Sequence, residues 1–132
     1  MDSRELVSKA CEAMKSAYTP YSGFKVGAAL LTKGGKVYTG CNIENASFSA
    51  TNCAERTAFF KAVYDGCYDF AAIAVVGGPA GKPVQAQDEP SGPCGVCRQV
   101  MQEFCAPSFM IYMGRSDGTY VAESLGAMLP YG

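Results

Sequence analysis

Two short stretches of the chain combine thiols with charged side chains, each at a point where a helical pattern begins. They are residues 51–56 (TNCAER) and 93–98 (PCGVCR). The CxxC spacing in the second stretch lets two thiolates reach one tetrahedral metal ion from a turn and the first turn of a helix. We expect one zinc ion to be held by three thiols, those of Cys53, Cys94 and Cys97. Glu55 would transfer protons beside the metal.

The absence of histidine narrows this chemistry. It excludes Ser-His-Asp and Cys-His catalysis, and also every histidine-ligated metal site. Three protein ligands with an open fourth position form the catalytic kind of zinc site, because water can occupy that position. Three thiolates on a doubly charged zinc ion leave an excess negative charge. The positive ends of two helices and a nearby arginine, Arg56 or Arg98, would offset it.

Each of these residues also has a simpler interpretation. The CxxC pair could be a redox dithiol instead of a metal site. Asn52 and Glu55 have the spacing of a capping box, in which Glu55 only stabilises the first helical turn. Either arginine could be solvated or paired at the surface. A zinc ligand two residues before Glu55 would favour the catalytic role for this carboxylate over the cap.

Length and composition favour a single domain over residues 1–132. Hydrophobic residues make up 48% of the chain and charged residues 17%, which is typical of a globular protein. A formal net charge of −1, without any block of like charge, argues against a nucleic-acid partner. We recognise no signal peptide and no apolar run of membrane-spanning length, so we expect a cytoplasmic protein without a membrane partner.

Hydrophobic periodicity and turn residues predict alternating helices and strands. The expected helices are 3–17, one from Cys53 to a stop at 65–66, one from Cys94 to a stop at 106–107, and a short one between Ser124 and Pro130. The expected strands are a hairpin over 25–41 with its turn at 33–36, a central strand at 70–76, and two more at 109–113 and 119–122. Residues 77–93 would form a long loop. This order predicts an α/β fold: one mixed five-stranded sheet with helices on both faces, a three-layer αβα arrangement.

With these motifs in view, the chain resembles the small, homotetrameric type of cytidine deaminase over nearly its whole length. The zinc-deaminase signature is a metal ligand two residues before a glutamate, followed later by Pro-Cys-x-x-Cys. Residues 53–55 and 93–97 match it. Three further stretches resemble motifs of the family: residues 21–30 (YSGFKVGAAL), 40–46 (GCNIENA) and 97–99 (CRQ).

The resemblance implies a role for each candidate residue near the metal. The zinc ligands, for one Zn²⁺ per chain, would be Cys53, Cys94 and Cys97. Glu55 would be the proton shuttle, and Arg56 would temper the charge of the thiolates.

The resemblance also implies how the substrate is held. Asn42 and Glu44 would hydrogen-bond the ribose hydroxyls, and Phe24 would pack on the pyrimidine ring. Without the family, Asn42 would suggest an Asx-turn, Glu44 a surface charge and Phe24 a core residue.

The implied reaction is the hydrolytic deamination of cytidine and 2′-deoxycytidine to uridine and 2′-deoxyuridine plus ammonia, as in pyrimidine salvage. Glu55 would deprotonate the zinc-activated water, which attacks C4 of the cytosine ring, and would protonate the ring nitrogen N3 before ammonia leaves.

Two positions depart from the family pattern. Family members often carry tyrosine where this chain has Phe48. They usually also continue beyond residues 129–132 to an aromatic that reaches a neighbouring subunit's site. Both departures concern completion of the pocket between subunits of the expected homotetramer.

Three other functions would use part of the same chemistry. A deaminase of a nucleoside antibiotic such as blasticidin S would share the zinc chemistry, but residues 42–46 look like a ribose-recognition loop. A nucleic-acid-editing deaminase would need a basic surface. A non-enzymatic zinc or redox module would need only the thiols.

Overall fold

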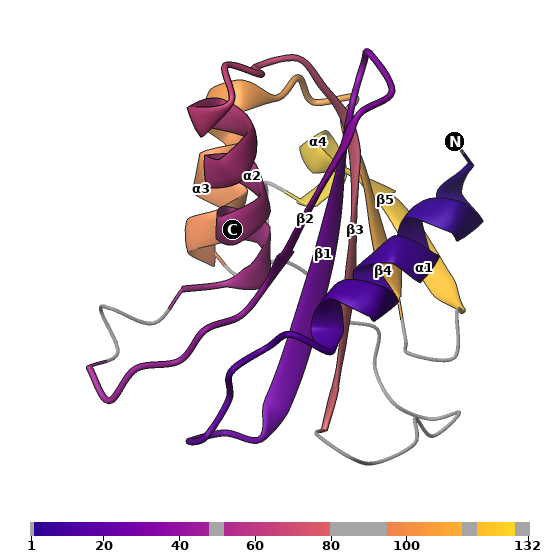
Figure 1. Cartoon of the computed structure of the whole chain (residues 1–132). Helices are drawn as coiled ribbons and strands as arrows, with labels where there is room; N and C mark the ends of the chain where they lie inside the picture. Colours follow the sequence, from indigo (N-terminus) through magenta and orange to yellow (C-terminus); the bar gives the residue numbers. More distant parts are fainter. Residues whose placement is uncertain (1, 48–51, 80–94, 115–118, 129–132) are drawn as a thin grey trace.

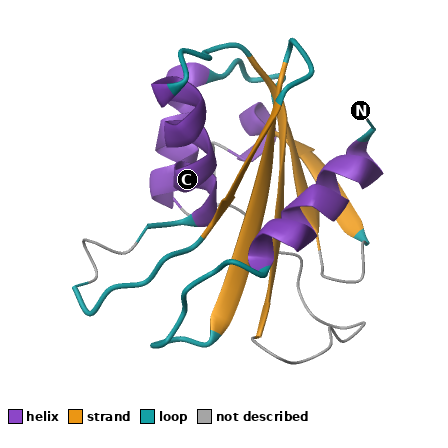
Figure 2. Cartoon of the chain, in the orientation of Figure 1, coloured by secondary structure: helices purple, strands orange, loops and turns teal. Residues whose placement is uncertain are grey.

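A mixed five-stranded sheet forms the middle layer of the molecule (Figures 1 and 2). The computed structural model describes residues 2–47, 52–79, 95–114 and 119–128. The strands lie in the order β2-β1-β3-β4-β5, with the bounds β1 Phe24–Thr32, β2 Val37–Cys41, β3 Phe70–Pro79, β4 Met110–Gly114 and β5 Tyr120–Ser124. Strands β3 and β4 pair in parallel, and the other neighbouring strands pair antiparallel.

Helices cover both faces of this sheet, as expected from the alternating pattern. Their bounds are α1 Ser3–Met14, α2 Ala54–Tyr64, α3 Gly95–Phe104 and α4 Leu125–Met128. Helix α1 packs on one face, whereas α2 and α3 lie side by side on the other (Figure 1). The predicted order of elements and the three-layer αβα architecture are therefore confirmed.

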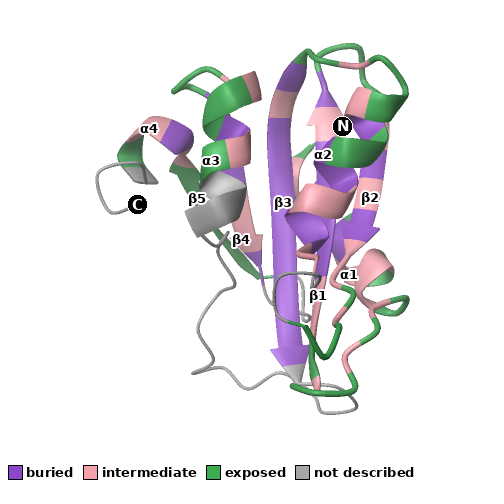
Figure 3. Ribbon diagram, turned by 90° about the vertical axis from the view of Figure 1, so that its left-hand side faces the viewer, coloured by how far each residue is buried: buried purple, intermediate pink, exposed green. Residues whose placement is uncertain are grey.

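The larger core lies between the sheet and helices α2 and α3. Phe59 of α2 is fully buried at its centre, with its ring centroid 5.0 Å from that of Phe70 and 6.3 Å from that of Phe109. A smaller, alanine-rich core lies under α1. Residues 72–78 of strand β3 are buried, and β5 is mostly exposed (Figure 3). The central position expected for the apolar strand at 70–76 is confirmed.

Two glycines let helices approach the sheet closely. A Cβ atom at Gly27 would overlap the carbonyl oxygen of Ala10 in α1, and one at Gly40 would overlap that of Ala54 in α2. No side chain fits at either position, so both helices lie directly on the strands. Gly40 thereby places the first turn of α2 against the end of β2.

Local cap and turn signals in the sequence agree with the structure. The Asp2 carboxylate accepts a hydrogen bond from the backbone N–H of Glu5 at 2.8 Å, as expected for the start of α1. The Ser124 hydroxyl accepts one from the N–H of Ala127 at 3.2 Å. Gly35 in the hairpin turn has a φ of +92°, a conformation that glycine adopts without strain.

Some predicted boundaries are wrong. Helix α1 ends at Met14 and not at residue 17, because the backbone of Tyr18 pairs with the segment that follows β2. Strand β3 extends to Pro79, where the sequence suggested a loop, because residues 77–79 pair with the start of β1. The remaining part of the expected loop, residues 80–93, lies outside the described residues. Within the described ranges, no helix has both the length and the apolar character to cross a membrane.

Candidate active site

Several predicted site residues meet at one end of the sheet. Helix α2 leads into β3, and α3 connects the parallel strands β3 and β4. Both helices therefore run opposite to these strands and begin near the strands' carboxyl ends, at the lower end of the view in Figure 1. The antiparallel strand β1 begins at this same end, with Phe24 paired to Pro79. In α/β sheets this end commonly carries the ligand site.

The loop after β2 is attached to the start of α2 by backbone pairing. Ile43 forms an antiparallel bridge with Asn52, with N–H···O distances of 3.0 and 2.9 Å. On its other side Ile43 bridges Tyr18 in parallel, and the N–H of Glu44 donates to the carbonyl of Tyr18 at 2.9 Å. These bridges place residues 42–44 alongside the segment that carries Cys53.

Cys53 occupies the N-cap position of α2. Its backbone is extended, with φ −77° and ψ 153°, and its side chain makes no capping hydrogen bond. The guanidinium Nη2 of Arg56, one turn along the helix, donates to the Cys53 sulfur at 3.5 Å. Arg56 is half-buried, so its interpretation as a solvated surface residue is wrong. A neighbouring cation and a helix N-terminus both favour the thiolate form of a cysteine.

Glu55 is buried, with only 4% of its surface exposed. A capping box needs the carboxylate at the third position after the N-cap residue. The N-cap residue of α2 is Cys53, and Glu55 is only the second residue after it. The predicted cap at Asn52 is wrong because Cys53, the next residue, is itself extended and takes the N-cap position. A buried glutamate in the first turn of a helix, two residues after a cysteine, suits proton transfer better than capping.

Thr57 joins the two segments and was not recognised from the sequence. Its hydroxyl accepts a hydrogen bond from the Asn52 side chain at 2.8 Å. It also lies 3.2 Å from the carbonyl oxygens of Cys41 and Cys53. The sequence signals only one of these contacts: a threonine four residues after the N-cap residue can hydrogen-bond the carbonyl of that residue, here Cys53. Only the fold reveals the contact with Cys41.

Asn42 fastens the loop to the start of β1. Its side-chain Oδ1 accepts from the N–H of Val26 at 2.9 Å, and its Nδ2 donates to the carbonyl of Phe24 at 3.0 Å. These partners are 16 and 18 residues away, so the Asx-turn interpretation is wrong. The bonds use one donor and one acceptor position of the amide and orient the remainder.

Glu44 organises the turn that precedes β1. One carboxylate oxygen accepts from the N–H groups of Tyr21 and Ser22, at 3.0 and 3.1 Å, and the other accepts from the Ser22 hydroxyl. The hydroxyl bond, followed by these two backbone bonds, lowers the pKa of Glu44 and keeps it ionised. Glu44 is therefore more than the simple surface charge considered from the sequence.

Phe24 is 43% exposed at the first position of β1, so its interpretation as a core residue is wrong. Tyr18, Tyr21 and Ile43 are also exposed, and they belong to the two loops that Glu44 joins. Aromatic side chains at this end of the sheet offer apolar surfaces on which a planar ring can pack.

Two of the three predicted zinc ligands lie in segments that begin neighbouring helices. Cys53 precedes α2, and Cys97 lies in the first turn of α3, the parallel neighbour of α2. Cys94 lies outside the described residues. In the described part of the chain, no alternative group of three cysteine, aspartate or glutamate side chains could hold a metal ion. By contrast, Cys105 packs against the larger core, where burial raises the pKa of its thiol to about 12.

Comparisons with known proteins agree with this chemistry. Residues 1–113 match a family model described as the cytidine and deoxycytidylate deaminase zinc-binding region. A cytidine deaminase of Sporosarcina psychrophila is 48% identical over 130 residues, which cover 98% of this chain and 90% of that protein. A blasticidin-S deaminase of Bacillus cereus is 30% identical over 126 residues, which cover 96% of this chain and 88% of that protein.

Comparison of the fold with solved structures also points to cytidine deaminases. The crystal structure of cytidine deaminase from Burkholderia pseudomallei superposes with a TM-score of 0.87 at 46% sequence identity, covering 98% of both chains. The α/β fold expected from the resemblance is thereby confirmed. By sequence and by structure, the chain belongs to the family of cytidine and deoxycytidylate deaminases that share a zinc-binding region.

Proposed function

We propose that this protein is a zinc-dependent hydrolase that converts cytidine and 2′-deoxycytidine to uridine and 2′-deoxyuridine, releasing ammonia, in pyrimidine salvage. The observation that carries the proposal is the buried Glu55, two residues after Cys53 in the first turn of α2, with the Ile43–Asn52 bridge joining the start of this helix to the loop of Asn42 and Glu44. Relatives with the same fold are cytidine deaminases.

Cys53, Cys94 and Cys97 would hold the zinc ion. When bound, zinc acts as a Lewis acid that activates a water molecule at neutral pH. Glu55 takes a proton from the attacking water, delivers it to the ring nitrogen N3, and later assists the departure of ammonia from C4. Such proton transfer contributes roughly 10²–10⁴-fold to the rate.

Arg56 tempers the negative charge of the thiolates through its bond to Cys53. This matters because excess charge on the ligands would oppose the loss of a proton from water. Asn42 and Glu44 receive the sugar hydroxyls, and the exposed ring of Phe24 packs on the pyrimidine. Polar groups held in this way reward a ligand that pairs with them and penalise one that does not.

The proposal includes a homotetramer in the cytoplasm with a nucleoside as its small-molecule partner. Large side chains of α2 and the following turn are exposed, with Phe60 49%, Tyr64 95% and Tyr68 58% accessible. Aromatic residues of this kind are enriched where protein subunits meet. Light scattering would report the mass of the assembly.

Deamination of blasticidin S is the second candidate, favoured by the match to the Bacillus cereus enzyme. The higher identity to cytidine deaminases supports the nucleoside as the main substrate. With either substrate, Glu55 would transfer protons and the three thiols would hold zinc.

The decisive experiment is an ultraviolet assay on cytidine, 2′-deoxycytidine, cytosine and blasticidin S in parallel. We expect absorbance loss with both nucleosides and much slower change with cytosine, because the free base offers nothing to Asn42 and Glu44. Elemental analysis should find one zinc per chain. Faster turnover of blasticidin S than of cytidine would overturn the main proposal in favour of the second, and inactivity on all four would refute both.

A further inference from the structure

The hydroxyl of Ser22 connects the two parts of the chain proposed to hold the substrate. It donates a hydrogen bond to Oε2 of Glu44 and accepts one from the backbone N–H of Phe24 at 3.0 Å. A single side chain thus links the carboxylate assigned to the sugar with the aromatic residue assigned to the base. The roles proposed for the other site residues do not involve Ser22.

The backbone around Ser22 is built to present it to Glu44. The N–H of Gly23 closes a turn on the carbonyl of Thr19 at 3.0 Å, and Gly23 itself has a φ of +67°. This turn points the N–H groups of Tyr21 and Ser22 at Oε1 of Glu44. The Ser22 hydroxyl donates to the other oxygen, Oε2, so both oxygens of the carboxylate are hydrogen-bonded.

The acceptor positions of Glu44 limit what remains for a ligand. A carboxylate offers about four lone-pair directions, two on each oxygen. Among the described residues, two N–H groups occupy Oε1 of Glu44 and the Ser22 hydroxyl occupies one direction of Oε2. About one acceptor direction is left, on Oε2. The bond from Ser22 therefore decides where that direction points.

We propose that Ser22 is a positioning residue for sugar recognition, which aims the remaining acceptor direction of Glu44 at one hydroxyl of the nucleoside. This inference rests on the proposed function, because it assumes that Glu44 receives a sugar hydroxyl. It predicts that the Ser22 hydroxyl affects binding of the sugar and not the chemistry at the base.

Phe24 depends much less on Ser22 than Glu44 does. Its carbonyl is held by the Nδ2 of Asn42 at 3.0 Å, and its backbone pairs with Pro79 of β3. Removing the Ser22 hydroxyl leaves these contacts in place. The loss should fall on the sugar contact, which separates a positioning role from a general structural one.

The test compares Ser22→Ala with Ser22→Thr, which keeps a hydroxyl, and with Ser8→Ala as a matched control at an exposed position on α1. Two ligands are used: cytidine as substrate, and 2′,3′-dideoxycytidine, which lacks both ring hydroxyls of the sugar. The affinity of the second is read as its inhibition constant against cytidine turnover, so its own rate of turnover does not matter. Thermal melting checks that each variant is folded.

We expect Ser22→Ala to raise the KM for cytidine about tenfold, with kcat within about twofold, because one charge-assisted hydrogen bond loses its geometry. The inhibition constant of dideoxycytidine should change by less than about twofold. Ser22→Thr and Ser8→Ala should stay close to the wild type. Equal losses for both ligands, or no loss with cytidine, would overturn the inference while the proposed function stands. A wild type without turnover of cytidine would instead overturn the proposed function, and this inference with it.

Discussion

The two ends of helix α2 are built in opposite ways. At the C-terminal end, backbone groups bond to one another: the N–H of Gly66 donates to Val63 at 3.0 Å, and that of Cys67 donates to Ala62 at 2.8 Å. At the N-terminal end, the cap residue is a cysteine whose side chain makes no capping bond. The C-terminal end is closed by backbone hydrogen bonds, whereas the N-terminal end carries a thiol at the cap position.

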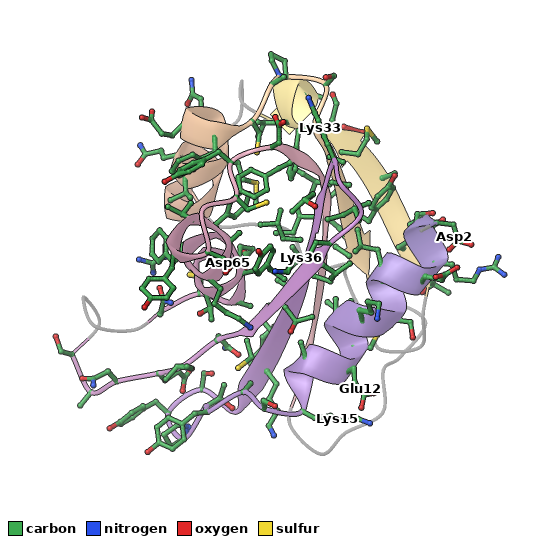
Figure 4. All side chains as sticks on the ribbon, turned by 45° about the horizontal axis from the view of Figure 1, so that its top comes forward. Asp2, Glu12, Lys15, Lys33, Lys36 and Asp65 are labelled. Carbon is green, nitrogen blue, oxygen red and sulfur yellow. The ribbon has the colours of Figure 1, made fainter. Side chains whose placement is uncertain are left out.

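Side chains reinforce this contrast. The Asp65 carboxylate, which follows the last turn of α2, accepts a hydrogen bond from the Lys36 ammonium at 2.7 Å; both residues are labelled in Figure 4. It also accepts one from the Tyr38 hydroxyl. The Lys36 nitrogen also lies 4.9 Å from the centre of the Tyr38 ring. These groups form a clamp that ties the helix to β2 and to the hairpin turn. They bind one another, which is a structural role.

The difference indicates where to look for function along a helix. Capping bonds stabilise a helix by roughly 1 kcal/mol, and a helix end that lacks such a bond needs another reason for its sequence. At the start of α2 the sequence has a cysteine, a buried glutamate and an arginine that bonds the cysteine. The proposed zinc site supplies that reason.

The largest expected effect comes from Cys53→Ala at the N-terminal end. Removing one of three thiolates should lower the zinc content from one per chain to a small fraction and abolish deamination, because two ligands hold zinc far more weakly than three. Elemental analysis of the purified variant measures the metal directly. Retention of a full zinc equivalent would show that Cys53 is not a ligand.

The next largest effect is expected for Glu55→Gln. The amide has nearly the same shape but cannot take a proton, so kcat should fall by roughly 10²–10⁴-fold or more with zinc retained. The ultraviolet assay and elemental analysis give both readouts on one sample. Full activity would mean that Glu55 serves only the helix.

A matched pair of glycine substitutions tests the comparison on stability. Gly23 and Gly66 have φ values of +67° and +83°, and a Cβ atom added to either would meet no atom within 4 Å beyond its chain neighbours. Alanine at either position should cost about 1–2 kcal/mol of folding free energy, because only the backbone is strained. Urea denaturation measures this cost.

Activity should separate these two variants. Gly23→Ala disturbs the turn that presents Ser22 to Glu44, so the KM for cytidine should rise by roughly fivefold to tenfold. Gly66→Ala lies at the clamped end of α2 and should leave kinetics at room temperature unchanged. Similar kinetic losses in both variants would contradict a functional role for the Gly23 turn and a purely structural role for the C-terminal end of α2.

The smallest effect is expected for Asp65→Asn, which weakens the clamp. The melting temperature should fall by about 1–4 °C without loss of activity, because the ion pair is exposed to solvent. Glu12→Gln is the control, since the pair between Glu12 and Lys15 is also exposed and joins only neighbouring turns at the end of α1. An equal fall for the control would mean that the clamp contributes nothing specific.

The difference in melting temperature between wild type and Asp65→Asn should depend on pH, because it depends on the charge of Asp65. The hydrogen bond from Lys36, and then that from Tyr38, lower the pKa of Asp65. A depressed carboxyl pKa adds stability that is complete above its ordinary value of 3.8 and disappears as the pH falls through the folded value. The difference in melting temperature between wild type and Asp65→Asn should therefore persist at neutral pH and shrink below about pH 4.

Much of the site is predictable from residue types and spacing. Cysteines and a glutamate at two helix starts, in a chain without histidine, are sufficient to predict a zinc site with a proton shuttle. The alternation of apolar patterns likewise predicts the order of all the described helices and strands. The CxxC pair, the Cys53–Glu55 spacing and the apolar periodicity each involve near neighbours in the chain, which spacing reports directly.

Other features depend on contacts between residues far apart in the sequence. The extended segment that ends at Cys53 begins with Asn52, which pairs with Ile43, and Glu44 is held by Ser22, 22 residues earlier. Periodicity carries no record of such pairs, since each partner satisfies the local rules equally well without the other.

The amino-acid sequence by itself determined the candidate zinc ligands, the helices that carry them and the family. Only the tertiary structure decided how Ser22, Asn42, Glu44 and Thr57 are joined around the start of α2. The physical reason is that a hydrogen bond depends on position and direction in space, and those are settled only once the whole sheet has formed.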